Sequence, residues 1–136
     1  MSSDDSLTTA LRRGLLGPGN YEWKGRIWLD GPPESPKPRR PYLTLTDFVG
    51  ETPRLQGDTR VLARERLMQV ELWQHAADES PAVIRRVHDL LDNMLLPGAF
   101  EHVYRVRVRN VVRSFEPDSK LTQHVFDVAV THNPHP

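Results

Sequence analysis

The sequence of 136 residues contains no cysteine. Disulfide bonds, thiolate metal sites and cysteine nucleophiles are therefore excluded. No apolar run approaches the roughly 18–20 residues that a membrane-spanning helix requires. The 18 basic and 18 acidic residues give a formal net charge of zero. A free-standing nucleic-acid-binding domain is usually clearly basic, so this balance argues against one, although charges of opposite sign can still gather on different faces.

Motifs for catalysis and cofactor binding are also missing. The sequence has no glycine-rich phosphate loop, no G-x-S-x-G and no H-E-x-x-H. His75 and His88 flank two carboxylates, Asp78 and Glu79, but the histidines lack the i, i+4 spacing of a helical metal-binding pair. We therefore expect no metal, no cofactor and no enzymatic activity.

What is present fits one compact domain over residues 1–136, with 38% hydrophobic and 26% charged residues. We expect residues 1–5 and 131–136 to be loose tails. Residues 31–41 hold five of the twelve prolines and are predicted to form an exposed loop. The acidic, polar start of the chain does not resemble a signal peptide, which favours a protein made and used, or assembled, in the cytoplasm.

Two helices are predicted from apolar residues that recur on one face. The first covers residues 6–16 and stops at the sequence GPGN. The second covers residues 81–96, because Ser80 is a suitable N-cap and Pro81 is favoured at the first helical position. Its apolar face consists of Val83, Val87, Leu90, Leu91 and Met94. The stretch that contains both histidines is thus interpreted as a strand followed by a helix.

Strands are predicted at residues 42–49 and 61–75, with a turn at residues 50–59, and residues 25–30 could form a further short strand. A β-hairpin is predicted within residues 102–131, with its turn at residues 116–120. The order helix, strand, strand, helix, strand, strand predicts an α+β domain: a four-stranded antiparallel sheet with helices packed on one face.

The first strand of this hairpin alternates apolar residues with arginines. The apolar residues are Tyr104, Val106, Val108 and Val112, and the arginines are Arg105, Arg107, Arg109 and Arg113. A register that places Val106 opposite Val130 and Val108 opposite Val128 would also pair Arg109 with Asp127. The arginine side is either an ordinary solvated face or a surface that meets another subunit or DNA phosphates. Trp73, on a neighbouring strand, favours an interface.

The chain resembles the tail terminator (tail completion) proteins of long-tailed bacteriophages. The resemblance rests on LTTALRRGLL, GRIWLDGPP, PYLTL, RERLMQVELW, PAVIRRVHDLLD, YRVRVRNVVRSFEPD and HVFDVAV, in this order. It spans roughly residues 7–130. The longer, proline-rich segment at residues 31–41 departs from the family pattern.

The resemblance implies a structural virion protein at the tail–head junction, where a ring of copies, usually six, ends tail-tube polymerisation. The implied partners are other copies of the chain, the tail tube protein, the head-connector protein and viral DNA that passes through the bore without sequence-specific binding. Membrane contact and cofactors are not implied. We expect Arg54, Gln56 and Asp58, in the predicted turn, to contact a neighbouring ring.

We also expect Arg105, Arg107, Arg109 and Trp73 to lie at a subunit interface or in the bore. Two alternatives remain open. One is another head–tail neck component of the same fold, and the other is a small nucleic-acid-binding module that uses the arginine strand.

Overall fold

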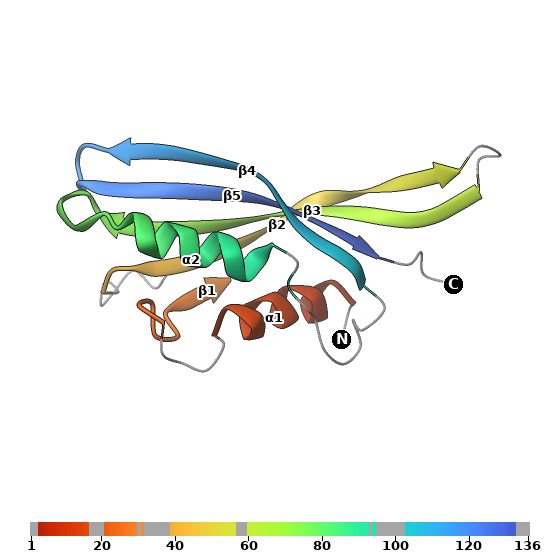
Figure 1. The fold of residues 1–136 in the computed structure, drawn as a ribbon, viewed down its shortest axis with the longest axis horizontal. Coiled ribbons are helices and arrows are strands. Elements are labelled where there is room, and N and C mark those ends of the chain that lie inside the picture. Colours follow the sequence, from red (N-terminus) through yellow and green to blue (C-terminus); the bar gives the residue numbers. More distant parts are fainter. Residues whose placement is uncertain are drawn as a thin grey trace.

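Two α-helices lie on one face of a twisted β-sheet in the computed structural model of the chain (Figure 1). The structure describes residues 3–16, 21–29, 31, 39–56, 60–92, 94 and 103–132. The elements are α1 (Ser3–Leu16), β1 (Ile27–Leu29), β2 (Tyr42–Gln56), β3 (Arg60–His75), the short 3₁₀-helix η1 (Ala76–Asp78), α2 (Pro81–Leu91), β4 (Val103–Glu116) and β5 (Leu121–His132).

The sheet has five strands in the order β1-β2-β3-β5-β4. The α+β class and the placement of the helices on one face are confirmed, but the prediction of four antiparallel strands is wrong. The additional strand β1 runs parallel to β2, with Ile27 opposite Leu43, while the other neighbours are antiparallel. Ile27 is buried, with a relative exposure of only 1%. The possible short strand at residues 25–30 is thus confirmed as β1, but three residues alternate too briefly for the sequence to show that they join the sheet.

Helix α2 begins as the sequence predicts. The Ser80 hydroxyl accepts a hydrogen bond from the Val83 N–H at 3.4 Å, and Pro81 occupies the first turn. The helix ends at Leu91, earlier than the predicted residue 96, because Asp92 adopts an extended backbone conformation. The Asp92 carboxylate then turns to β4, where it accepts hydrogen bonds from Val108 N–H and Arg107 Nε, each at 3.1 Å. Residues 95–100 lie outside the described residues.

The elements at the two ends of the described chain are longer than the sequence indicated. Helix α1 begins at Ser3, and β5 continues to His132, so both elements include residues that the sequence analysis assigned to terminal tails. Most of the proline-rich segment, residues 32–38, lies outside the described residues.

The predicted turn at residues 50–59 is wrong, since β2 continues to Gln56 and β3 starts at Arg60. These strands form a hairpin arm that projects beyond the helices (Figure 1). Arg54 is registered against Ala63 and Gln56 against Arg60, while Asp58 lies outside the described residues. The proline in this arm has no N–H to donate, but β1 pairs only with Leu43–Leu45, so β2 is an edge strand there and tolerates it.

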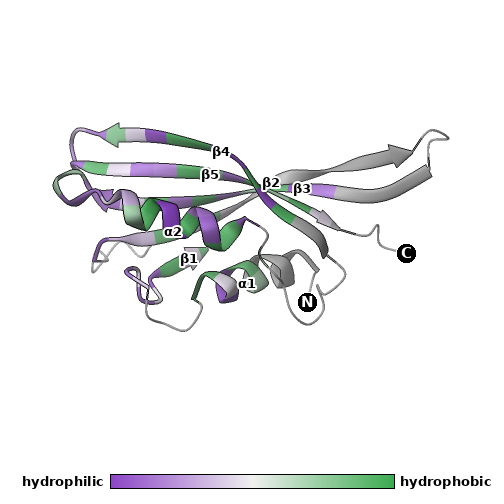
Figure 2. Ribbon diagram, in the orientation of Figure 1, coloured by the Kyte–Doolittle hydropathy of each residue, from purple (hydrophilic) through white to green (hydrophobic). Residues whose placement is uncertain are grey.

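The hydrophobic core lies between the helices and the sheet. Apolar and polar residues alternate along the strands and around α2 (Figure 2). Trp23 and Phe126 are the largest fully buried side chains. The Trp23 indole N–H reaches the Leu15 carbonyl at 2.9 Å, so its one polar group is satisfied inside the core.

A β-bulge divides β4 into two halves. The predicted pairs of Val106 with Val130 and Val108 with Val128 are confirmed. The predicted pair of Arg109 with Asp127 is wrong, because the register shifts between Val108 and Asn110 and places Asn110 opposite Asp127. One extra residue reverses the side on which every later side chain lies.

The buried Phe126 provides a test of the core. Phe126→Ala should lower the free energy of unfolding by about 3–5 kcal/mol, because it removes a fully buried ring and leaves a cavity. The matched control is Leu29→Ala, since Leu29 is 44% exposed and its loss should cost no more than about 0.5 kcal/mol. Urea unfolding measures both values. Equal losses in the two variants would contradict this description of the core.

Candidate functional site

The face of the sheet opposite the helices carries most of the ordered polar side chains of the strands. We call it the helix-free face. Its members alternate along each strand with buried residues such as Met68, Val70 and Leu72. They are Tyr42, Thr44 and Thr46 of β2, Leu67, Gln69, Glu71 and Trp73 of β3, Asn110, Val112 and Ser114 of β4, and Gln123, Val125 and Asp127 of β5.

A chain of hydrogen bonds crosses this face over four strands. Thr46 Oγ1 and Gln123 Nε2 donate to the two carboxylate oxygens of Glu71, at 3.2 and 2.7 Å. Ser114 Oγ donates to Gln123 Oε1 at 3.1 Å. In a second row, Gln69 Nε2 donates to Asp127 Oδ1 at 3.1 Å. All of these donors are neutral side chains, and they hold both carboxylates in place on this face.

Aromatic side chains end the helix-free face on the β1 side. Tyr42 lies between Trp73, with ring centroids 6.1 Å apart, and Trp28, at 5.7 Å in an edge-to-face arrangement. The Trp73 indole N–H donates to Thr44 Oγ1 at 3.1 Å. The structure thus places Trp73 on the same face as the polar chain, where it is partly exposed. The expected place of Trp73 at a subunit interface or in the bore remains a prediction.

The arginines of β4 do not form one continuous stripe. Arg107 pairs with Asp92 and Arg109 with Glu65, whereas Arg113 is registered against the buried His124 and lies on the helix side. The bulge causes this division. Arg105 is registered against Thr131 in the first half of β4. The three described guanidinium groups each have a carboxylate partner within the chain.

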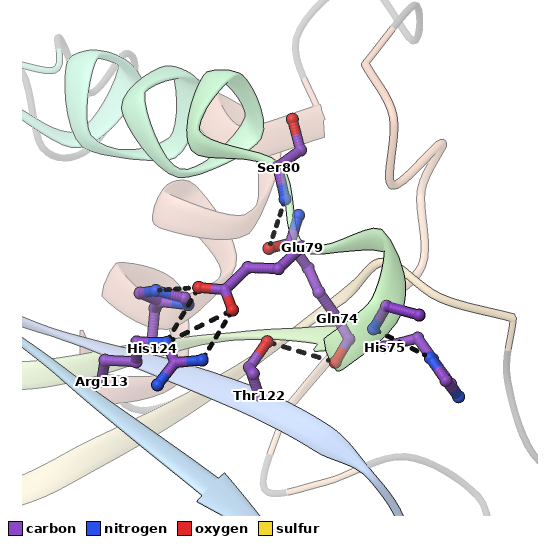
Figure 3. Close-up of polar contacts among 8 residues, drawn as sticks. Gln74, His75, Glu79, Ser80, Arg113, Thr122 and His124 are labelled. Atoms are coloured by element: carbon purple, nitrogen blue, oxygen red, sulfur yellow. Dashed lines mark hydrogen bonds and ion pairs between the residues drawn. The ribbon is translucent and has the colours of Figure 1, made fainter.

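The partner of Arg113 is Glu79, which the sequence analysis named only as one of two carboxylates between His75 and His88. Arg113 holds its carboxylate with Nε and Nη2, at 2.9 and 2.8 Å, and His124 Nε2 lies 3.4 Å from it (Figure 3). Next to Glu79, the Ser80 N–H donates to Gln74 Oε1 at 3.3 Å. This cluster joins the start of α2 to β3, β4 and β5. No local signal could have identified it, because its members are far apart in the sequence.

The cluster changes the acidity of two of its groups. The hydrogen bonds from Arg113 lower the pKa of Glu79 below its ordinary value. Burial lowers the pKa of His124, and the negative charge of Glu79 offsets this only in part. His124 Nδ1 is buried and has no hydrogen-bond partner among the described residues. The imidazole therefore favours its neutral form in the folded chain.

Among the described residues, no group of three or more His, Asp or Glu side chains is arranged to hold a metal ion. Neither described helix combines the length and the apolar character needed to cross a bilayer.

The lowered pKa of His124 predicts the pH dependence of stability. Below its ordinary pKa of about 6.5, the unfolded chain binds a proton at this residue while the folded chain resists it, so stability falls as the pH falls. The lowered pKa of Glu79 also makes stability fall as the pH falls, but only at pH values below the ordinary pKa of a glutamate carboxyl. Between pH 7 and about pH 5.5, the melting temperature should drop by a few degrees, and His124→Gln should reduce this drop.

The matched control for this measurement is His88→Gln, which removes an exposed histidine of α2 and should leave the drop unchanged. An equal drop in wild type and His124→Gln would show that His124 is not the group responsible.

Comparison with known proteins shows which fold the chain has. No protein-family model and no curated protein matches the sequence. Among solved structures, a chain from the virion of a native gene transfer agent particle matches with a TM-score of 0.69 and 13% identity, over 94% of this chain and 95% of that chain. A second solved chain matches with a TM-score of 0.61 and 15% identity, over 100% and 99%. The chain shares its whole fold with both.

Proposed function

We propose that the chain is a structural virion protein that forms a ring at the head-proximal end of a phage tail tube. There it ends tube polymerisation and provides the surface that joins the tail to the head connector. The observation that carries this proposal is the likeness to a chain of a gene transfer agent virion, which covers 94% of this chain and 95% of that chain. In this role the chain needs no catalytic group and no cofactor.

The resemblance to tail terminators supports the finer assignment. The seven sequence segments that carry it follow the order of the elements, from LTTALRRGLL in α1 to HVFDVAV in β5. GRIWLDGPP includes β1, the strand that completes the five-stranded sheet. The resemblance therefore extends over the helices and the sheet. The structural match to the gene transfer agent chain has the same extent, since it covers 94% of this chain and 95% of that chain.

In the proposed ring of six copies, the helix-free face lines the bore and the helices lie outside. The carboxylates of Glu71 and Asp127 are held on this face by neutral donors. They would repel the phosphates of passing DNA, which therefore slides through without being retained. The arginines do not reverse this effect, because Arg107 and Arg109 are paired with carboxylates of the same chain.

These ion pairs also weigh against the nucleic-acid-binding module. A phosphate backbone is bound when cations are available to replace its counterions. Arg107, Arg109 and Arg113 already have carboxylate partners, and Arg113 lies on the helix side, away from Arg107 and Arg109. The strand thus lacks the continuous basic surface that such a module requires.

The hairpin arm is suited to contact a neighbouring ring. It carries Arg54 and Gln56 in paired strands and extends beyond the helices (Figure 1). An arm of this kind reaches past the body of its own subunit, so we assign contacts with the tail tube or the head connector to it. Asp58, which lies outside the described residues, is proposed for the same contact.

The first test of the proposed function is electron microscopy of the purified chain. We expect closed rings of uniform diameter in negative stain, with a mass by light scattering close to six copies. Mixed with tail tubes, these rings should cap one end of each tube and stop its growth. A chain that stays monomeric at high concentration and does not bind tubes would contradict the proposal. Rings that bind only the head connector would favour another neck component.

The second test concerns the bore. The double substitution Glu71→Lys with Asp127→Lys should make the rings retain double-stranded DNA, with an affinity that falls steeply as salt is raised. The matched control is Asp78→Lys with Asp89→Lys, which makes the same change in net charge at exposed positions of η1 and α2. Fluorescence anisotropy of a labelled duplex measures both. Equal DNA binding by the two variants would show that the helix-free face does not line the bore.

A further inference from the structure

The outer strand β4 has an open edge over its second half, and exposed apolar side chains gather there. Strand order places β4 at one end of the sheet, with β5 as its neighbour (Figure 1). Residues 109–116 are all exposed. Among the described residues, five large hydrophobic side chains are exposed, and three of them are Val111, Val112 and Phe115 of this strand. An open edge with such side chains is a template for the addition of another strand.

Other outward-facing groups of the sheet are closed by contacts within the chain. In the first half of β4, the Val108 N–H donates to the Asp92 carboxylate at 3.1 Å. At the opposite end of the sheet, Arg12 Nε donates to the Ile27 carbonyl of β1 at 3.0 Å, and the Ile27 N–H donates to the Gly25 carbonyl at 2.9 Å. A strand that pairs with β4 is therefore confined to the part that follows Val108.

We propose that β4 of one copy pairs with β4 of a second copy, antiparallel and about a two-fold axis at Val112, so that the free chain is a dimer with one continuous sheet. A two-fold contact uses the same surface on both partners. It does not close a ring of six, whose neighbours are related by a sixfold rotation. The contact therefore concerns the chain before it enters the proposed ring, and the inference does not depend on that ring.

The sequence around Val112 is complementary to itself when one copy is reversed. With Val112 facing its own counterpart, Val111 faces Arg113 of the second copy and Asn110 faces Ser114. The axis then joins two apolar residues, a polar residue meets a polar residue, and Val111 packs on the aliphatic part of an arginine. Each pair also shares a side of the sheet, since Asn110, Val112 and Ser114 lie on the helix-free face and the other two lie on the helix side.

The exposed hydrophobic residues all gain apolar neighbours in this register. Phe115 lies diagonally across from Val111 of the second copy, within reach of an aromatic side chain. Both are on the helix side, because they are registered against the buried Thr122 and Phe126. Val112 contacts its counterpart on the helix-free face. One contact thus covers the three exposed hydrophobic residues of the strand in both copies.

Other positions of the axis are less favourable. The axis must pass through a residue, because facing residues share a side of the sheet and successive residues of one strand do not. An axis at Arg113 would oppose two like charges, which is destabilising. An axis at Val111 would set Val112 against Asn110, and an axis at Ser114 would set Val112 against a carboxylate, that of residue 116.

Disulfide cross-linking tests the axis, because the chain has no cysteine of its own. Under mild oxidation, most of the Val112→Cys variant should run as a dimer on a non-reducing gel. Directly opposed Cα atoms lie about 4.5–5.5 Å apart, which a disulfide can span. The matched control is Phe115→Cys, which is similarly exposed. Phe115 faces residue 109 of the second copy, so its own counterpart lies about 20 Å away and this variant should stay monomeric on the gel.

A second pair of positions keeps the test independent of Val112. Asn110→Cys combined with Ser114→Cys should also give cross-linked dimers. Within one copy these positions are about 13 Å apart along the strand, which excludes an internal bond. Ser114→Cys alone is the control and should remain monomeric, because its counterpart is displaced by the same distance.

A charge on the axis should break the dimer without unfolding the chain. In Val112→Lys, two like charges face each other, so the dissociation constant of the dimer should rise at least tenfold in sedimentation measurements. Leu67→Lys is the control, since it adds the same charge at another exposed position of the helix-free face and should leave the dimer unchanged. Equal dissociation constants in the two variants would overturn the inference.

Electron microscopy of the same preparations separates this inference from the proposed function. Closed rings without a Val112→Cys dimer in the free chain would overturn the inference and leave the ring intact. A Val112→Cys dimer in a chain that neither forms rings nor binds tail tubes would support the two-fold contact and contradict the proposed function. Equal dimer bands in Val112→Cys and Phe115→Cys would also overturn the inference, because random collisions would then explain them.

Discussion

The carboxylate of Asp92 connects the helix layer to the outer strand of the sheet, and several features of the fold depend on this contact. Asp92 ends α2 and binds both the Val108 N–H and the Arg107 side chain. The bulge of β4 follows immediately, between Val108 and Asn110. It transfers Arg113 to the helix side, where this residue can reach Glu79. One interaction thus marks the end of a helix, the reversal of side chains along β4 and the start of the open edge.

Helices cover only one face of the sheet, so the other face must satisfy its polar groups by itself. Glu71 does this by accepting hydrogen bonds from both neighbouring strands, through Thr46 and Gln123. Partly buried polar groups need such partners, and Thr46 and Gln123 supply them. The described part of the face is therefore ordered by contacts within the chain and carries two carboxylates that neutral donors hold in place. A surface of this kind fits the proposed bore, which must let a polyanion pass and must keep its shape as it does so.

Open edges are a hazard for a β-sheet protein, because each one can pair with an unrelated strand. This chain manages one part of the problem with the Asp92 contact and another with Pro53 in the hairpin arm.

The sequence by itself determined the α+β class, the start of α2 at Ser80 and the pairs of Val106 and Val108 with β5. These follow from capping chemistry and residue periodicity, which act over a few neighbouring residues. It also indicated Trp73 and the arginines as the informative polar residues, but not their partners. Only the tertiary structure decided the parallel pairing of β1 with β2, the bulge, the hairpin arm and the cluster of Glu79, Arg113 and His124. The physical reason is that these depend on contacts between residues far apart in the chain, which no local pattern records.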